Sequence, residues 1–138
     1  MPARDRYHAA VRAALIKDGW TITHDPLRLD YAGEDLYVDL GAERLLGAEK
    51  GEQRIAVEIK SFLGPSRMAD LHEAIGQYIV YRDVLEEIEP AREVYLAVPA
   101  DAALSIFEAP IGQLLLQKQR PRIIAFDPNV QEITRWIP

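Results

Sequence analysis

The chain contains no cysteine, which excludes disulfide bonds and thiolate metal sites. It also contains no apolar run approaching the roughly 18 residues that a membrane-spanning helix needs. The first residues, Met-Pro-Ala-Arg-Asp-Arg-Tyr-His, hold no hydrophobic segment of the signal-peptide type. These absences favour a cytoplasmic protein that does not associate with membranes.

Several functional motifs are absent too. The sequence has no G-x-x-x-x-G-K-[ST] loop and no G-x-G-x-x-G turn, so nucleotide-driven and hydride-transfer chemistry have no support. Basic residues are in deficit, because 16 Lys and Arg face 22 Asp and Glu, for a net charge of −6. This deficit disfavours broad, non-specific binding to nucleic acid, although a bound cation reverses the local sign of an acidic site.

The residues that are present describe one α/β domain over 1–138, since 49% are apolar and no linker or repeat interrupts the chain. Apolar residues at helical spacing follow a capping residue, Ser66, while Val94 to Val98 form an uninterrupted apolar run typical of a central strand. In the first half of the chain, the pattern predicts a helix over 4–18, strands over 20–24 and 27–31, and a hairpin made of an extended segment over 36–49, a turn at Lys50-Gly51 and a return strand over 54–62. In the second half, it predicts a helix from Ser66 to Glu89-Pro90, a strand over 94–98, a helix over 110–119 and a closing hairpin of 122–126 and 130–136. We therefore expect a mixed β-sheet flanked by helices.

The segment Ala-Val-Glu-Ile-Lys over 56–60 indicates a site. Side chains alternate along a strand, so Glu58 and Lys60 lie on the same face, about 6.6 Å apart along the chain. A carboxylate and an ammonium at the end of an apolar strand suit metal-assisted phosphodiester hydrolysis, in which the acid holds Mg²⁺ (or Mn²⁺) and the lysine stabilises the attacked phosphate or orients the water. The alternative is an ion pair on an exposed strand edge.

A two-carboxylate metal site needs a second acid. Counted back from a turn at Lys50-Gly51, Glu43 lies across the hairpin from Glu58 and Lys60, while Asp39 lies four residues further out at the base of the same segment. Either carboxylate can share a cation with Glu58. Glu43 fits this register better, and Asp39 is the shorter acid that follows an apolar strand, so both stay open as metal ligands.

Two helices add candidate residues. Gln77 and Tyr81 are four residues apart and therefore share a helix face, where an amide and a hydroxyl can contact a phosphate or a metal-bound water. The alternative is that Tyr81 belongs to the core and Gln77 borders it. In the first helix Asp5 and His8, three residues apart, are candidates for metal binding or positioning, or else a solvated pair near the terminus.

This order of residues resembles a known pattern. An acid on a hairpin (Asp39 or Glu43), then Glu58-Ile59-Lys60, then Gln77 and Tyr81 on the next helix is similar to the PD-(D/E)xK nuclease superfamily, and to its RecB-like and Cas4-like branch. Over most of the chain, the segments ARDRYHAAVRAALIKDGWTITHDPLRL, DLYVDLGAERLLGAEKGEQRIAVEIKSFLGPS, AIGQYIVYRDVLEEIEP and FDPNVQEITRWIP resemble the XisH family. Members of this family are called fdxN element excision controlling factor proteins and are typical of cyanobacteria.

The resemblance implies a restriction-endonuclease-like mixed sheet with an αβββαβ core and an extra C-terminal β-hairpin. It also implies an accessory role in site-specific excision of a DNA element, beside a DNA recombinase and a small partner called XisI. Under that role two functions stay open. One is a Mg²⁺-dependent DNA endonuclease in which Glu58 and the second acid bind metal, Lys60 stabilises the phosphate or positions the water, and Gln77 and Tyr81 support them. The other is a non-catalytic module that regulates a recombinase through protein contacts.

Two departures from the superfamily pattern bear on this choice. The proline-aspartate pair is missing, because Asp39 follows Val38 and Glu43 follows Ala42, which leaves the second acid open. The chain is also small and acidic without a separate DNA-reading domain, so contact with DNA would fall to a homodimer mate or to a partner. The closing hairpin, with Trp136-Ile137-Pro138, either contacts such a partner or packs on its own sheet.

Overall fold

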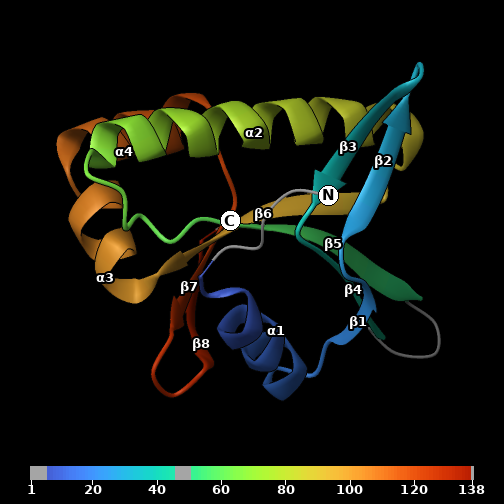
Figure 1. The fold of residues 1–138 in the computed structure, drawn as a ribbon, viewed down its shortest axis with the longest axis horizontal. Helices are drawn as coiled ribbons and strands as arrows, with labels where there is room; N and C mark the ends of the chain where they lie inside the picture. Colours follow the sequence, from blue (N-terminus) through green and yellow to red (C-terminus); the bar gives the residue numbers. More distant parts are fainter. Residues whose placement is uncertain (1–5, 46–50, 138) are drawn as a thin grey trace.

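The computed structural model describes residues 6–45 and 51–137, which form a mixed α/β fold (Figure 1). The helical segments are α1 (His8–Lys17), α2 (Arg67–Ile88), α3 (Ala100–Ala102), the π-helical turn η1 (Ala103–Phe107) and α4 (Pro110–Lys118). The strands are β1 (Thr21–His24), β2 (Leu27–Tyr31), β3 (Glu34–Val38), β4 (Leu40–Leu45), β5 (Glu52–Ile59), β6 (Arg92–Pro99), β7 (Ile123–Asp127) and β8 (Glu132–Ile137).

Six of the strands form one mixed sheet in the order β1-β4-β5-β6-β7-β8. The central strands β5, β6 and β7 are parallel, and the pairs β1–β4, β4–β5 and β7–β8 are antiparallel. Figure 1 shows α2 and α4 on one face of this sheet and α1 on the other. The predicted mixed sheet flanked by helices is confirmed, and the apolar run Val94–Val98 lies in the central strand β6.

The alternation of side chains along β5 explains the two faces. Ile55, Val57 and Ile59 point into the apolar cluster beneath α1, while Ala56 points into the cluster beneath α2. Glu58 has the same parity as Ala56 and so lies on the α2 face. The sequence of this strand therefore buries one carboxyl group between the sheet and α2.

Helix α2, which covers the site, begins where the sequence predicts. The Ser66 hydroxyl accepts a hydrogen bond from the amide of Ala69 at 3.1 Å, which satisfies one unpaired donor of the first helical turn. Asp70, also in that turn, accepts a bond from the amide of Gly64 at 3.0 Å. These two contacts fix the direction in which α2 leaves the end of β5.

Several boundaries differ from the prediction. Strand β5 ends at Ile59 rather than at residue 62, and Phe62 adopts a left-handed backbone with φ of 55°, which a strand does not accommodate. Strands β2 and β3 pair only with each other, as a separate two-stranded sheet. The short segments α3 and η1 have no counterpart in the prediction. The predicted turn at Lys50-Gly51 begins at a residue outside the described ranges.

The closing hairpin packs on its own sheet. The Trp136 ring lies 5.2 Å from the Tyr95 ring, edge to face, and 5.9 Å from the Trp20 ring. Trp136 is half-buried by these contacts. Of the two alternatives for this residue, packing is therefore the one that the structure shows. In the described ranges, no helix combines the length and the apolar character needed to cross a membrane.

Candidate functional site

The candidate site begins at Asp39, the one residue between β3 and β4. Its neighbours Val38 and Leu40 belong to different sheets, so Asp39 lies at the bend where the chain leaves the β2–β3 hairpin and enters the six-stranded sheet. Leu40 pairs with Val57 of β5, which places Asp39 beside Glu58. The register thus brings one of the two proposed second acids to the end of β5.

Reciprocal hydrogen bonds join Asp39 and Glu58. The amide of Asp39 donates to Oε1 of Glu58 at 3.2 Å, and the amide of Ile59 donates to Oδ2 of Asp39 at 2.8 Å. Each carboxyl group is therefore held by the backbone next to the other one. This arrangement fixes both side chains before any ligand binds.

Glu58 is the strongly perturbed group of the site. It is 6% exposed, and burial, followed by the nearby charge of Asp39 and a hydrogen bond between the two carboxyl groups, raises the pKa of Glu58 to about 9. The charge of Lys60 acts in the opposite direction but is a smaller effect. At neutral pH the pair therefore retains one proton, because two adjacent carboxylates cannot both ionise in a desolvated site.

Lys60 follows β5 and continues its pairing with β6. Its amide donates to the carbonyl of Ala97 at 2.9 Å. Its ammonium pairs with Glu73 of α2, with Nζ at 2.5 Å from Oε1. Glu73 was not among the predicted site residues, although its position four residues before Gln77 was a usable signal.

Helix α2 presents Glu73, Gln77 and Tyr81 on one face, because they are spaced four residues apart. The Tyr81 hydroxyl donates to the carbonyl of Tyr37 at 3.1 Å. Burial and the charges of Glu58 and Asp39 raise the pKa of Tyr81, so it stays protonated.

Tyr81 combines the two alternatives considered for it, while the described residues show no hydrogen bond from Gln77 to Asp39, Glu58 or Lys60. Tyr81 is a core residue, 8% exposed, whose polar end reaches the site. Gln77 is half-buried, and its Oε1 atom has no hydrogen-bond partner among the described residues. Because this atom is itself buried, a ligand can reach it only if the surrounding side chains move.

Glu43 lies elsewhere, and the register that placed it opposite Glu58 and Lys60 is wrong. Glu43 pairs with Arg54, four residues before Glu58, which corresponds to about 13 Å along the strand. Its carboxylate lies 3.5 Å from Nε of Arg54 and 4.0 Å from the Arg92 guanidinium. Counting from Lys50-Gly51 put the centre of the hairpin too late in the sequence, and this error shifted the register.

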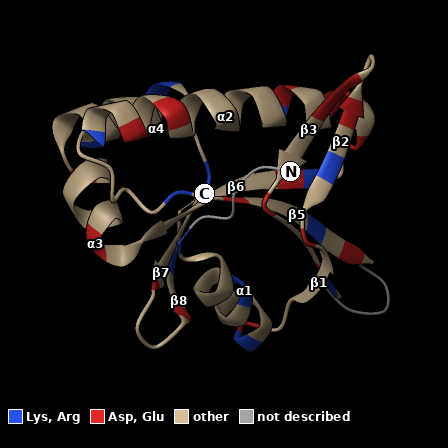
Figure 2. Ribbon diagram, in the orientation of Figure 1, with Lys and Arg blue, Asp and Glu red and all other residues tan. Residues whose placement is uncertain are grey.

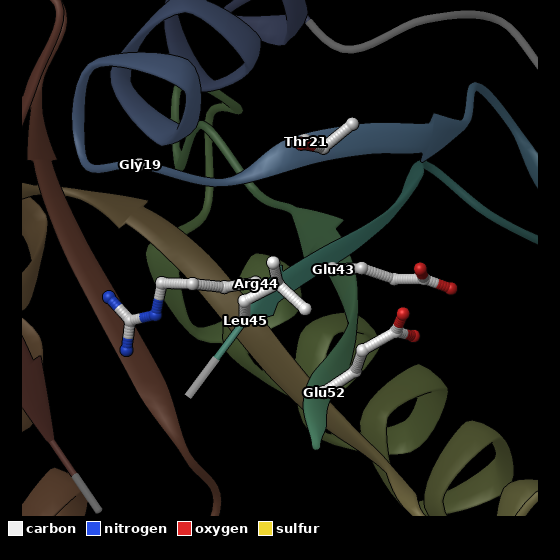
Figure 3. Close-up of a pocket in the computed structure, with 6 residues that line it drawn as sticks. All are labelled: Gly19, Thr21, Glu43, Arg44, Leu45 and Glu52. Atoms are coloured by element: carbon white, nitrogen blue, oxygen red, sulfur yellow. The ribbon is translucent and has the colours of Figure 1, made fainter. Parts of the chain in front are cut away.

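Figure 3 shows the surroundings of Glu43. With Glu52 it borders a hollow of about 410 Å³ near the far end of β4, where both carboxylates point to the same side and Arg44 points to the opposite side. This hollow is lined by Gly19, Thr21, Glu43, Arg44, Leu45 and Glu52. It is distinct from the site at Asp39 and Glu58.

The described residues of α1 pack on the face of the sheet opposite this site. Asp5 lies outside the described residues. His8 is 5% exposed, and its Nε2 lies 2.7 Å from Oδ1 of Asp25. The other oxygen of that carboxylate, Oδ2, accepts a hydrogen bond from Arg12 at 2.8 Å. The expected pairing of Asp5 with His8 is thus untested, while His8 is a buried residue rather than a solvated one.

The chemistry available at Asp39, Glu58 and Lys60 is that of a small acidic pair next to a cation. In the described parts of the chain, no three His, Cys, Asp or Glu side chains gather in an arrangement that could hold a metal ion. Two carboxylates with the remaining positions left to water match Mg²⁺, which usually keeps several waters, better than a metal that needs a full set of protein ligands.

Comparison with known proteins places the chain in a family. The family profile described as "XisH protein" matches residues 1–134. The chain belongs to the XisH family. A crystal structure of an XisH family protein from Nostoc punctiforme PCC 73102 is 36% identical, with a TM-score of 0.88 over 97% of this chain and 100% of that one.

A second structure agrees with this assignment. The crystal structure of a fdxN element excision controlling factor protein from Anabaena variabilis is 38% identical, with a TM-score of 0.88 over 98% of this chain and 100% of that one. A comparison with curated proteins gives no match. The resemblance to the XisH family is confirmed, and the family fold extends over the whole described chain.

Proposed function

We propose that this protein is an accessory factor in the site-specific excision of a DNA element, and that it acts through a Mg²⁺-dependent phosphodiester site at Asp39, Glu58 and Lys60. The family name and the printed name of the Anabaena variabilis relative support the excision role. The buried carboxyl pair at the end of β5 supports the metal-dependent site, and it is the observation that carries the proposal. The fold would then be a variant of the restriction-endonuclease-like fold.

The residues present suit a divalent cation. Asp39 and Glu58 would hold it. Near pH 7 the pair retains a proton because two adjacent negative charges repel each other, and a bound cation would neutralise them in place of that proton. When bound, Mg²⁺ supplies Lewis-acid stabilisation of a phosphoryl oxygen and a more acidic water. The backbone bonds to both carboxylates set their orientation, so the ligands need not reorganise.

Lys60 supplies the positive charge for the phosphate. Its side chain is 15% exposed, and its ammonium pairs with Glu73, whose side chain is more than half exposed. A phosphodiester that meets this ammonium lies beside the carboxyl pair, as phosphodiester hydrolysis requires. Lys60 would stabilise the charge that develops on the attacked phosphate.

Gln77 and Tyr81 support these three residues from α2. Tyr81 ties the carbonyl of Tyr37 to α2 and so holds the end of β3, two residues before Asp39. Its hydroxyl also lies near enough to Glu58 for the charge of that carboxyl group to raise the pKa of Tyr81. Gln77 offers an acceptor to a metal-bound water or a donor to a phosphate oxygen.

Metal binding tests the proposal directly. We expect titration calorimetry with Mg²⁺ or Mn²⁺ to show one site in the natural protein, and to show its loss in Asp39→Asn and in Glu58→Gln. Glu43→Gln is the matched control, because it removes a carboxylate from the same hairpin but far from Glu58, and we expect it to bind normally. Binding near pH 7.5 should release about one proton and weaken about tenfold per unit of decreasing pH, because the metal replaces the proton on Glu58.

Cleavage of supercoiled and branched DNA, assayed in parallel, tests the chemistry. We expect Mg²⁺-dependent cleavage that is lost in Glu58→Gln and Lys60→Ala and retained in Glu43→Gln. Metal binding that survives in Glu58→Gln but not in Glu43→Gln would reject this choice of ligands. No metal binding and no cleavage, with or without a XisI-type protein, would overturn the catalytic proposal.

The second candidate function is a regulatory module without catalysis, acting with a XisI-type partner and a DNA recombinase. The net charge of −6 favours it. Figure 2 also shows acidic and basic segments interspersed over the elements, with acidic segments gathered at the tip of the β2–β3 hairpin. In this function a homodimer mate or the partner would supply the contact with DNA.

A further inference from the structure

Lys60 already has an anionic partner within the protein. Nζ of Lys60 lies 2.5 Å from Oε1 of Glu73 on α2. The two side chains differ in exposure, since 15% of the Lys60 side chain and 58% of the Glu73 side chain are accessible. The lysine is thus fixed by the fold, while the glutamate approaches it from the solvent side.

We propose that Glu73 is an intramolecular counterion that occupies the anion-binding position of Lys60 in the free protein and is displaced when a DNA phosphodiester binds. This inference rests on the proposed role of Lys60 in phosphate binding. A carboxylate and a phosphate compete for the same ammonium, because each supplies anionic oxygen acceptors. Glu73 would thereby weaken binding of DNA that does not fully engage the site.

The exposure of Glu73 makes displacement inexpensive. An ion pair with one side chain more than half exposed is screened by water and salt and shifts an equilibrium by only about two- to five-fold. When the carboxylate swings away, it regains full hydration without disturbing the core. The Glu58 and Asp39 carboxyl groups, by contrast, are held by backbone amides and stay in place.

The competition predicts that removing the charge of Glu73 strengthens DNA binding. We expect Glu73→Gln to bind a short fluorescent DNA duplex about two- to five-fold more tightly than the natural protein, measured by anisotropy at low salt with EDTA present to prevent cleavage. Glu87→Gln is the matched control, because it removes the same charge from an exposed position near the other end of α2. We expect that control to change the affinity much less.

A double-variant cycle assigns the effect to Lys60. In the Lys60→Ala background, Glu73→Gln should no longer increase the affinity, because the competition has lost its target. If Lys60→Ala weakens binding but Glu73→Gln behaves like Glu87→Gln, the competition is refuted and the phosphate-binding role of Lys60 survives. If the duplex does not bind, or binds equally with and without Lys60, both the competition and the role of Lys60 are refuted.

Discussion

At the scale of single residues, the decisive feature is a carboxyl group that the fold keeps protonated. Glu58 lies on the same face of β5 as the buried Ala56, and it is itself buried beside the charge of Asp39. Burial of an ionised carboxylate is costly unless a cation accompanies it. Such a group is retained at a cost in stability, which is typical of functional sites.

That cost is measurable as a pH dependence. The pKa of Glu58 is raised to about 9 in the folded protein from 4.5, so between these values the unfolded chain has lost a proton that the folded chain keeps. The free energy of unfolding therefore falls as pH rises through this window. We expect Glu58→Gln to gain stability relative to the natural protein between about pH 5 and pH 8, by at least about 1 kcal/mol, in urea unfolding without metal.

Glu87→Gln again serves as the control and should follow the natural protein at each pH, since its side chain is exposed. If the free energies of unfolding of Glu58→Gln and the natural protein change with pH in the same way over this window, Glu58 ionises normally in the folded protein. In that case the acidic pair would not carry the extra proton on which the metal proposal depends.

At the scale of elements, the segment from α3 to α4 depends on one close approach. A Cβ atom at Gly112 of α4 would lie 2.1 Å from the carbonyl oxygen of Ile106 and 2.5 Å from the Cα of Phe107, both in η1. Backbone atoms cannot move aside cheaply, so only glycine fits. This contact holds η1 and α4 together in the crossover between β6 and β7.

Two glycine substitutions separate this packing effect from helix propensity. We expect Gly112→Ala to lower the free energy of unfolding by about 1–3 kcal/mol because of the clash with η1. Gly76→Ala, in the interior of α2, where the new Cβ would meet no described atom within 4 Å apart from its adjacent residues and the nearby backbone of the helix, should raise it by about 0.5–1 kcal/mol. Urea denaturation measures both, and a neutral or stabilising Gly112→Ala would show that η1 and α4 can separate.

At the scale of the whole molecule, the six-stranded sheet joins two apolar layers. Helix α2 packs on one face with a cluster that includes Leu71, Tyr78 and Leu96, and α1 packs on the other with Leu15 and Trp20. Strands β5, β6 and β7 contribute side chains to both layers. Because both layers pack on the same strands, unfolding of one layer would disrupt the sheet and expose the apolar side chains of the other.

We therefore expect one cooperative unfolding transition. Far-ultraviolet circular dichroism follows mainly the long helix α2, while fluorescence follows Trp20 and Trp136, which lie against each other on the α1 face. Urea midpoints from the two probes should coincide, as two-state unfolding requires. Separate midpoints would show that the two layers are independent units and would contradict the single domain expected over 1–138.

The sequence predicted the features that depend on local pattern. Ser66 and the apolar spacing after it encode α2, and the run Val94–Val98 encodes β6. The predicted boundaries of these two elements lie within two residues of those in the structure. Alternation along β5 likewise predicted that Glu58 and Lys60 share a face. Segments without such a signal, α3 and η1, were missed, and η1 is held against α4 by the tertiary contact at Gly112.

The sequence by itself determined the order of the longer helices and the central strands, the family and the pair Glu58–Lys60, because periodicity and motif spacing are local properties of the chain. Only the tertiary structure decided which acid joins Glu58 and which anion meets Lys60. Strand register is set by how a whole hairpin pairs, and it placed Asp39 at Glu58 and Glu43 at Arg54. The docking of α2 on the sheet brought Glu73 to Lys60 and Tyr81 to Glu58, across distances in sequence that no local pattern specifies.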